Sequence, residues 1–281
     1  MSAEPVLVFG ATGSQGGAVA RELLSRAVPV RALVRDSASE RARALSDLGA
    51  ELVVGDLTDE WSLAQAFSTV PVAYAITTPF ENGADAEVRQ GDTIIRAAAQ
   101  AGLPWLILAS VAAADRAPVP HFRSKARIEA QLGAGSVPWT VVAPSYFYEN
   151  VLGASLAEGV LPLPLPVHTP LDQVALRDLG ALVAAILDRR DEHLSARIEV
   201  AADAPTPEQM ATALGVRAVQ TSISELAPRN PDLAAMYTFL AQTGYGIDIP
   251  ALRARYPEVS WSRFADWAAD LQHKAEPDEG N

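Results

Sequence analysis

Short apolar segments alternate with amphipathic segments along this chain as far as about Tyr148. The apolar segments, such as Val30-Arg31-Ala32-Leu33-Val34 and Thr140-Val141-Val142-Ala143, are nearly continuous in their apolar character. Strands buried on both faces of a parallel sheet have this pattern, whereas half-exposed strands alternate apolar and polar positions. We therefore predict strands at 5–10, 28–34, 50–54, 71–77, 104–110 and 137–143, with helices near 15–26, 38–48, 59–68, 84–101 and 120–133.

The pattern changes after Asn150. Residues 159–166 are rich in proline and poor at forming a helix, so we predict a loop or an edge strand that walls the site. A helical pattern resumes at 178–187, residues 197–201 predict one more strand, and Thr206-Pro207 is typical of a helix start. Further helices are predicted at 231–243, 248–256 and 261–273, followed by a frayed tail at 276–281.

The first predicted strand leads directly into a glycine-rich turn, Gly10-Ala11-Thr12-Gly13-Ser14-Gln15-Gly16. Gly10 allows the tight turn, Gly13 lets backbone N–H groups approach a pyrophosphate, and Gly16 permits close contact between helix and strand. A diphosphate would lie at the positive end of the helix dipole. The turn therefore predicts a dinucleotide site that includes Thr12, Ser14 and Gln15.

The alternation and the turn together predict an α/β fold, a Rossmann-type doubly wound parallel sheet. Residues 1–150 would form the NAD(P)-binding domain. Residues 151–281 would form a smaller, mostly helical C-terminal portion that faces the substrate or a partner. The spacing G-x-x-G-x-x-G indicates the short-chain dehydrogenase style of cofactor site.

Basic residues are few, so their clustering between Arg31 and Arg43 is informative. Folds that prefer NAD usually place an acid at the end of the second strand, where this chain has Arg35. Arg35 favours a 2′-phosphate, and hence NADP(H), and Arg41 could add positive charge. Alternatively, Arg35 is a solvated edge residue and Asp36 holds the ribose of NAD. Arg31 lies within the strand and is expected to pair with an acid.

The ends of the later strands supply further candidates. Asp56 and Leu57 follow the third strand, where a carboxylate or the neighbouring backbone can accept from the adenine amino group. Asp56 could instead cap a helix, although Asp59 suits that role better. Ser110 ends the fifth strand and could orient a substrate carbonyl or merely cap the strand end. The backbone of Thr77, Thr78 and Pro79, at the end of the fourth strand, is predicted to pass beneath the nicotinamide ribose.

His121 and Lys125 lie four residues apart at the start of a predicted helix and therefore share one face. A lysine at this place can hydrogen-bond the nicotinamide ribose and keep nearby proton donors acidic. The alternative is a surface lysine without a role.

Several motifs together resemble those of the NmrA-like family, a group of atypical short-chain dehydrogenase/reductase proteins. They are residues 10–16, 31–35, 55–57, His121-x-x-Ser-Lys125, 144–150, 174–180 and 206–208, so the similarity covers nearly the whole chain. The resemblance implies NADP(H) binding in the N-terminal domain and a small C-terminal portion that closes over the nicotinamide. Pro144, Tyr146 and Phe147 are predicted to join the cofactor site. The family contains both reductases and redox-sensing regulators that bind the dinucleotide without turning it over.

One position departs from the pattern of ordinary short-chain dehydrogenases, which carry Tyr-x-x-x-Lys. This chain has His121 at the place of the tyrosine. Imidazole titrates near neutral pH and can act as a general acid, but a histidine here can equally be a helix-start residue. Tyr146 could supply the hydroxyl instead, or only wall the nicotinamide pocket.

The amino-acid composition excludes several classes of function. The 281 residues are 49% hydrophobic, which is enough for a sizeable core, and the absence of cysteine excludes disulfides and thiolate catalysis. The four histidines are scattered without ligand spacing, so no metal is predicted. A net charge of −12 argues against direct nucleic-acid binding. Residues 1–4 lack the features of a signal peptide and no apolar stretch could span a bilayer, so we expect a cytoplasmic protein without membrane contact.

Two functions fit these observations. The first is an NADP(H)-dependent reductase of a small apolar carbonyl or quinone-like substrate, with Phe80, Tyr146, Phe147 and residues 159–166 lining the pocket. The second is a non-catalytic NADP(H) sensor that acts through a regulatory protein partner. A sugar-nucleotide epimerase or dehydratase is less suited, since it would be expected to show the tyrosine and a larger substrate domain. NAD as cofactor and a homodimer are left open.

Overall fold

The computed structural model describes residues 4–275, so the predicted tail at 276–281 lies outside the described residues. The chain forms two compact units. The first contains the described residues up to Ala143 together with Leu179–Glu199, and the second contains Pro144–Asp178 and the residues from Val200 onward. Leu179–Glu199 lies within the predicted C-terminal portion, but in the structure this segment carries most of a strand that extends the sheet of the first unit.

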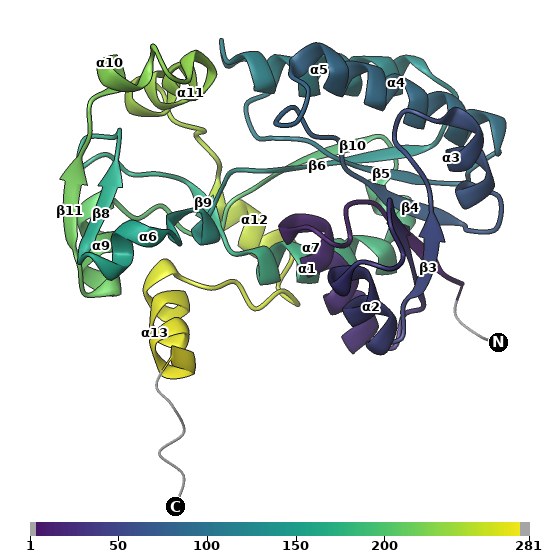
Figure 1. The fold of residues 1–281 in the computed structure, drawn as a ribbon, viewed down its shortest axis with the longest axis horizontal. Coiled ribbons are helices and arrows are strands. Elements are labelled where there is room, and N and C mark those ends of the chain that lie inside the picture. Colours follow the sequence, from purple (N-terminus) through teal and green to yellow (C-terminus); the bar gives the residue numbers. More distant parts are fainter. Residues whose placement is uncertain (1–3, 276–281) are drawn as a thin grey trace, which may run out of the picture. The chain divides into compact units, whose positions relative to one another are not determined.

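Seven strands of the first unit form one sheet in the order β10-β6-β5-β4-β1-β2-β3 (Figure 1). Adjacent strands from β6 to β3 pair in parallel; Val6, for example, lies opposite Val30 on one side and Val72 on the other. This topology confirms the predicted Rossmann-type sheet. The strands are β1 (Val6–Val8), β2 (Val30–Val34), β3 (Glu51–Val54), β4 (Val72–Ala75), β5 (Leu106–Ala109), β6 (Trp139–Pro144) and β10 (Ala196–Val200).

Helices cover both faces of this sheet. In Figure 1, α3, α4 and α5 lie on one face, and α1, α2 and α7 lie on the other. Every residue of β1, β4 and β5 is buried, as the continuous apolar pattern predicts. The helices of the first unit are α1 (Ser14–Ser25), α2 (Glu40–Asp47), α3 (Glu60–Phe67), α4 (Ala84–Gln100), α5 (Pro120–Ala134), α8 (Arg190–His193) and all but the first turn of α7 (Leu176–Asp188).

Local capping chemistry explains where several helices begin. Asp59 accepts a hydrogen bond from the backbone N–H of Trp61 and caps α3, as the sequence favours. Pro120 lies in the first turn of α5, where a missing N–H costs nothing. Thr206 and Gln209 form a reciprocal capping box at the start of α9 (Pro207–Leu214).

The second unit contains two short parallel strand pairs. The segment 159–166, predicted as a loop or an edge strand, contains β8 (Val160–Leu163), which pairs with β11 (Arg217–Gln220). β7 (Tyr146–Phe147) pairs with β9 (Gln173–Val174). Around them lie α6 (Ala154–Ala157), α9, α10 (Ile223–Leu226), α11 (Pro231–Gln242), α12 (Ile249–Arg255), α13 (Phe264–Ala275) and a 3₁₀ helix (Tyr148–Val151). Over residues 4–275, none of the helices combines the length and apolar character that crossing a bilayer requires.

Candidate functional site

A pocket of about 590 Å³ lies at the carboxyl ends of β1, β2, β3 and β4 in the first unit. The order of strands in the sheet reverses between β1 and β4, which is where open α/β sheets bind their ligands. The lining contains all predicted cofactor residues of the first unit except Pro79 and Lys125. It comprises Gly10, Thr12, Gly13, Ser14, Gln15, Gly16, Leu33, Val34, Arg35, Arg41, Gly55, Asp56, Leu57, Thr58, Ile76, Thr77, Thr78, Glu81, Asn82 and Gln90.

The glycine-rich turn forms one wall and has no room for a side chain at Gly10 or Gly16. Gly10 has a φ of +61°, and its carbonyl oxygen accepts a hydrogen bond from the N–H of Gly13 at 2.9 Å. A Cβ at Gly16 would lie under 3.0 Å from the carbonyl oxygens of Phe9 and Gly10. Gly13 caps α1 without a side-chain hydrogen bond, and the first N–H groups of a helix have no acceptor within it. The turn thus offers a cradle of backbone donors that fits a diphosphate.

Gln15 is held across the turn by a residue that the sequence analysis missed. Its side-chain amide donates to the hydroxyl of Tyr74 at 2.8 Å. Tyr74 lies on β4 and is fully buried, and burial raises the pKa of its phenol, so the hydroxyl stays neutral. A single hydroxyl within the otherwise apolar segment 71–76 was the available signal.

Arg35 lies at the pocket with an acidic partner that was not predicted. Its guanidinium nitrogens lie 3.2 and 3.3 Å from the carboxylate oxygens of Glu81, which follows β4. Three-quarters of the Arg35 side chain is exposed. Arg31, in contrast, pairs with Glu51 on the neighbouring strand at 3.0 Å, as expected for a basic residue inside β2.

Asp56 also lines the pocket, but one of its oxygens is already used. Oδ1 accepts hydrogen bonds from the hydroxyl of Thr58 at 2.7 Å and from its backbone N–H at 2.8 Å. These hydrogen bonds lower the pKa of Asp56 below its ordinary value. The carboxylate is therefore ionised near neutral pH, and its predicted contact with the adenine stays a prediction.

Lys125 belongs to a buried polar cluster around Thr77. Its ammonium lies 2.8 Å from the carbonyl oxygen of Thr77, 2.9 Å from the Thr77 hydroxyl and 2.9 Å from Glu87. Glu87 is fully buried and also accepts from the hydroxyls of Thr77 and Ser124. Burial lowers the pKa of Lys125, while the charge of Glu87 opposes this shift.

Glu87 and Ser124 were not predicted, although the sequence held a signal for Glu87. It shares a face of α4 with Gly91, Ile94 and Ala98, at helical spacing. A carboxylate on the apolar face of an amphipathic helix needs a buried partner. The ammonium of Lys125 is that partner, and it lies on a different helix.

Ser110 is likewise part of a network. Its hydroxyl donates to Glu129, which pairs with Arg197 at 2.8 Å, and Arg197 pairs with Glu199 at 2.7 Å. Burial pushes the pKa of Glu199 upward, but hydrogen bonds from Arg116 and other donors bring it down to about 2. The network sets the position of Ser110 at the end of β5.

His121 lies among aromatic rings at the start of α5. Its ring is 4.7 Å from that of Phe122, edge to face, and 6.1 Å from that of Phe80, which is exposed. Pro79 belongs to the turn before α4, where its carbonyl oxygen accepts from Gly83 at 2.8 Å. A catalytic role for His121 stays a prediction.

Pro144, Tyr146 and Phe147 belong to the second unit, so their predicted roles at the cofactor also stay predictions. The hydroxyls of Tyr146 and Tyr237 are 3.0 Å apart and hydrogen-bonded. Burial raises the pKa of the Tyr146 phenol.

Sequence comparison identifies the family. The profile of the NmrA-like family matches residues 2–233. The chain belongs to the NmrA-like family. The predicted resemblance is thus confirmed, and it extends over both units.

Known proteins of this kind differ in what they do. The chain is 29% identical to the NAD(P)H azoreductase of Xenophilus azovorans over 188 residues, which are 66% of this chain and 63% of the azoreductase. It spans only about half the length of several other curated relatives.

Two solved structures illustrate the shared fold. One is the NADPH-dependent quinone oxidoreductase QOR2 from Escherichia coli, complexed with NADPH, at a TM-score of 0.79 and 24% identity, covering 95% of this chain and 99% of that one. The other is NmrA, a negative transcriptional regulator, in complex with NADP, at a TM-score of 0.79 and 18% identity, covering 100% and 99%.

Proposed function

We propose that this NmrA-like protein binds NADP(H) in the first-unit pocket and reduces a small apolar carbonyl or quinone-like compound. The observation that carries the proposal is the pocket itself, which joins the glycine turn of β1 to Arg35 and Arg41 beyond β2. The N–H groups of residues 14–16 would hold the diphosphate, and the two guanidinium groups would hold a 2′-phosphate. The names of the azoreductase and of the quinone oxidoreductase are consistent with this chemistry.

When bound, a reduced nicotinamide supplies the hydride. The protein positions the cofactor and the substrate, and it supplies a proton. Lys125 and Glu87 hold the backbone and hydroxyl of Thr77, just after β4. The nicotinamide ribose is predicted to bind at this place. We assign proton donation to His121, because an imidazole can act as a general acid, while burial raises the pKa of the Tyr146 phenol.

One observation favours the alternative function, a non-catalytic NADP(H) sensor that acts through a protein partner. An ammonium has three N–H groups, and Lys125 has three close acceptors within the protein. Binding a ribose hydroxyl would require one of them to be exchanged. The likeness to the regulator NmrA fits this alternative as well.

Two measurements on the same preparation separate the two functions. Calorimetry with NADPH and NADH should show binding of both, with NADPH favoured at least about tenfold, and Arg35→Gln should remove that preference. A panel of quinones and activated carbonyls should consume NADPH, and His121→Phe should lower kcat. Binding without turnover across the panel would favour the sensor. Folded protein that binds neither nucleotide would refute both functions.

A pair of glycine variants tests the cradle directly. Gly16→Ala should abolish nucleotide binding, because its Cβ would press on the backbone of the turn. Gly133→Ala, which adds the same methyl group on exposed α5 with the nearest side-chain atom 3.9 Å away, should bind normally. Normal binding by Gly16→Ala would place the nucleotide elsewhere.

A further inference from the structure

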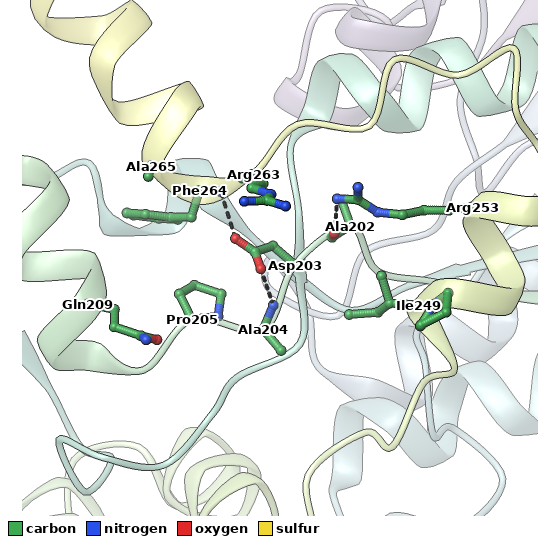
Figure 2. A pocket seen from close by; sticks show the side chains of 11 residues that line it. Ala202, Asp203, Ala204, Pro205, Gln209, Ile249, Arg253, Arg263, Phe264 and Ala265 are labelled. Carbon is green, nitrogen blue, oxygen red and sulfur yellow. Dashed lines mark hydrogen bonds between the residues drawn. The ribbon is translucent and has the colours of Figure 1, made fainter.

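The second unit contains a pocket of its own, with a volume of about 880 Å³. All of its lining residues belong to that unit, and none of them lines the first-unit pocket. Figure 2 shows Arg253 and Arg263 on either side of the segment that carries Ala202 and Asp203. We propose that this pocket binds a small organic carboxylate with an apolar body, held through the guanidinium groups of Arg253 and Arg263.

The charge of the residues that line the pocket favours an anionic ligand. The protein as a whole has a net charge of −12, yet this pocket combines two arginines with one acid. Among the described residues, neither arginine has a carboxylate within ion-pair distance. Arg253 attracts Asp178 only at longer range, so neither guanidinium is engaged in a direct ion pair with a protein carboxylate.

Most of the hydrogen-bonding capacity of Arg253 is also unused. Its Nη2 donates to the carbonyl oxygen of Ala202 at 2.7 Å, and its Nε is buried without a hydrogen-bond partner. A guanidinium has five N–H groups, arranged in a fork that matches a carboxylate. The bond to Ala202 fixes the orientation of Arg253, which leaves the other terminal nitrogen for a ligand.

The acid in the lining, Asp203, has a structural role. Its Oδ1 accepts from the backbone N–H of Ala204, and its Oδ2 accepts from that of Phe264, both at 2.9 Å. Both carboxylate oxygens are therefore directed at the backbone, as Figure 2 shows for these two hydrogen bonds. Asp203 joins the segment after β10 to the start of α13, and the lining keeps a net positive charge.

The other side chains indicate the class of anion. Pro205, Ile249 and Phe264 add apolar surface beside the guanidinium groups. An inorganic anion would leave this apolar surface in water, whereas a neutral apolar compound would strip water from the arginines without replacing it. A carboxylate on an apolar body satisfies both parts of the pocket, which is the usual composition of a small-molecule site.

Benzoate and benzamide test the proposal, since they share a shape but differ in charge. Binding to the full chain would be followed by saturation-transfer NMR in the presence of saturating NADPH. Benzoate should bind saturably, and benzamide should bind at least about tenfold more weakly. Arg263→Gln should weaken benzoate at least about tenfold. Arg229→Gln, which removes the same charge from an exposed position of the same unit, should leave benzoate binding unchanged.

The outcomes are distinct. Equal binding of benzamide and benzoate, or equal effects of Arg263→Gln and Arg229→Gln, would overturn the proposal, as would the absence of saturable benzoate binding. The affinity for NADPH, measured on the same variants, should not change. A loss of NADPH binding in all samples would refute the proposed function of the first-unit pocket but would leave the carboxylate site unaffected.

Discussion

The two units stabilise their buried and partly buried carboxylates in different ways. In the first unit, Glu199 accepts hydrogen bonds from two arginine side chains, and its pKa falls to about 2 although burial alone would raise it. In the second unit, Asp178 accepts from the N–H of Ser262 at 2.7 Å and from its hydroxyl at 2.8 Å. Arg177 Nε lies 3.7 Å away, too far to hydrogen-bond. Burial therefore dominates and raises the pKa of Asp178.

The difference shows where a negative charge is needed. In the first unit a partly or fully buried carboxylate balances a neighbouring cation, so neutralising either partner leaves the other charge uncompensated. In the second unit neutral donors would serve a neutral acceptor of the same shape equally well. A neutralising substitution should therefore cost more stability in the first unit, and a change of pH should act on stability in opposite directions in the two regions.

The largest effect is expected for the buried pair Glu87 and Lys125. Lys125→Met leaves Glu87 as a buried charge without its cation and should cost about 3–5 kcal/mol in the free energy of unfolding, measured in urea. Glu87→Gln should cost a similar amount. The double variant should lose clearly less than the sum of the two. Additive losses would show that the pair is not the stabilising unit.

Glu199→Gln should cost about 3 kcal/mol at pH 7. The folded pKa of about 2 lies below the ordinary 4.5, so this contribution is present above pH 4.5 and is lost as the pH falls from about 4.5 to about 2. Urea unfolding at a series of pH values should show a shallower acid limb for the variant. Glu192→Gln, an exposed control, should keep the acid limb of the parent protein. An unchanged acid limb in Glu199→Gln would contradict the assignment.

Asp178→Asn should cost under about 1 kcal/mol at pH 7, because an amide can accept from the N–H of Ser262 and donate to its hydroxyl. The pH dependence has the opposite sign here. The folded pKa lies above 3.8, so stability decreases as the pH rises through the window above 3.8, and the variant should lack this decrease. The same urea titrations measure it. A loss of stability larger than that of Glu199→Gln would contradict the proposed difference between the two units.

The smallest effect on stability is expected for Glu81→Gln, since the pair with Arg35 is exposed. Unfolding should change by no more than about 0.5 kcal/mol. Calorimetry should nevertheless show tighter NADPH binding, because Arg35 loses a competing anion within the protein. Asp85→Asn removes a comparable exposed partner of Arg127 outside the pocket lining and should leave NADPH binding unchanged. Equal behaviour of the two variants would show that Arg35 does not contact the nucleotide.

Much of the first unit could be predicted because the signals are local. Apolar continuity predicted β1 to β6, and helical periodicity together with caps such as Asp59 predicted α1 to α5. The second unit was less predictable. β11 is short and only partly buried, and it is a strand because it pairs with β8, more than fifty residues earlier in the chain.

The chain by itself determined the family, the glycine turn and the residues available to line the pocket. A Cβ is excluded at Gly16 by its own neighbours in sequence, and such constraints act within a few residues. Only the tertiary structure decided the electrostatic partners, because Lys125 reaches Thr77 across 48 positions and Arg35 reaches Glu81 across 46. Charges interact through space, so burial and the packing of distant elements set which of them pair and how far each pKa moves.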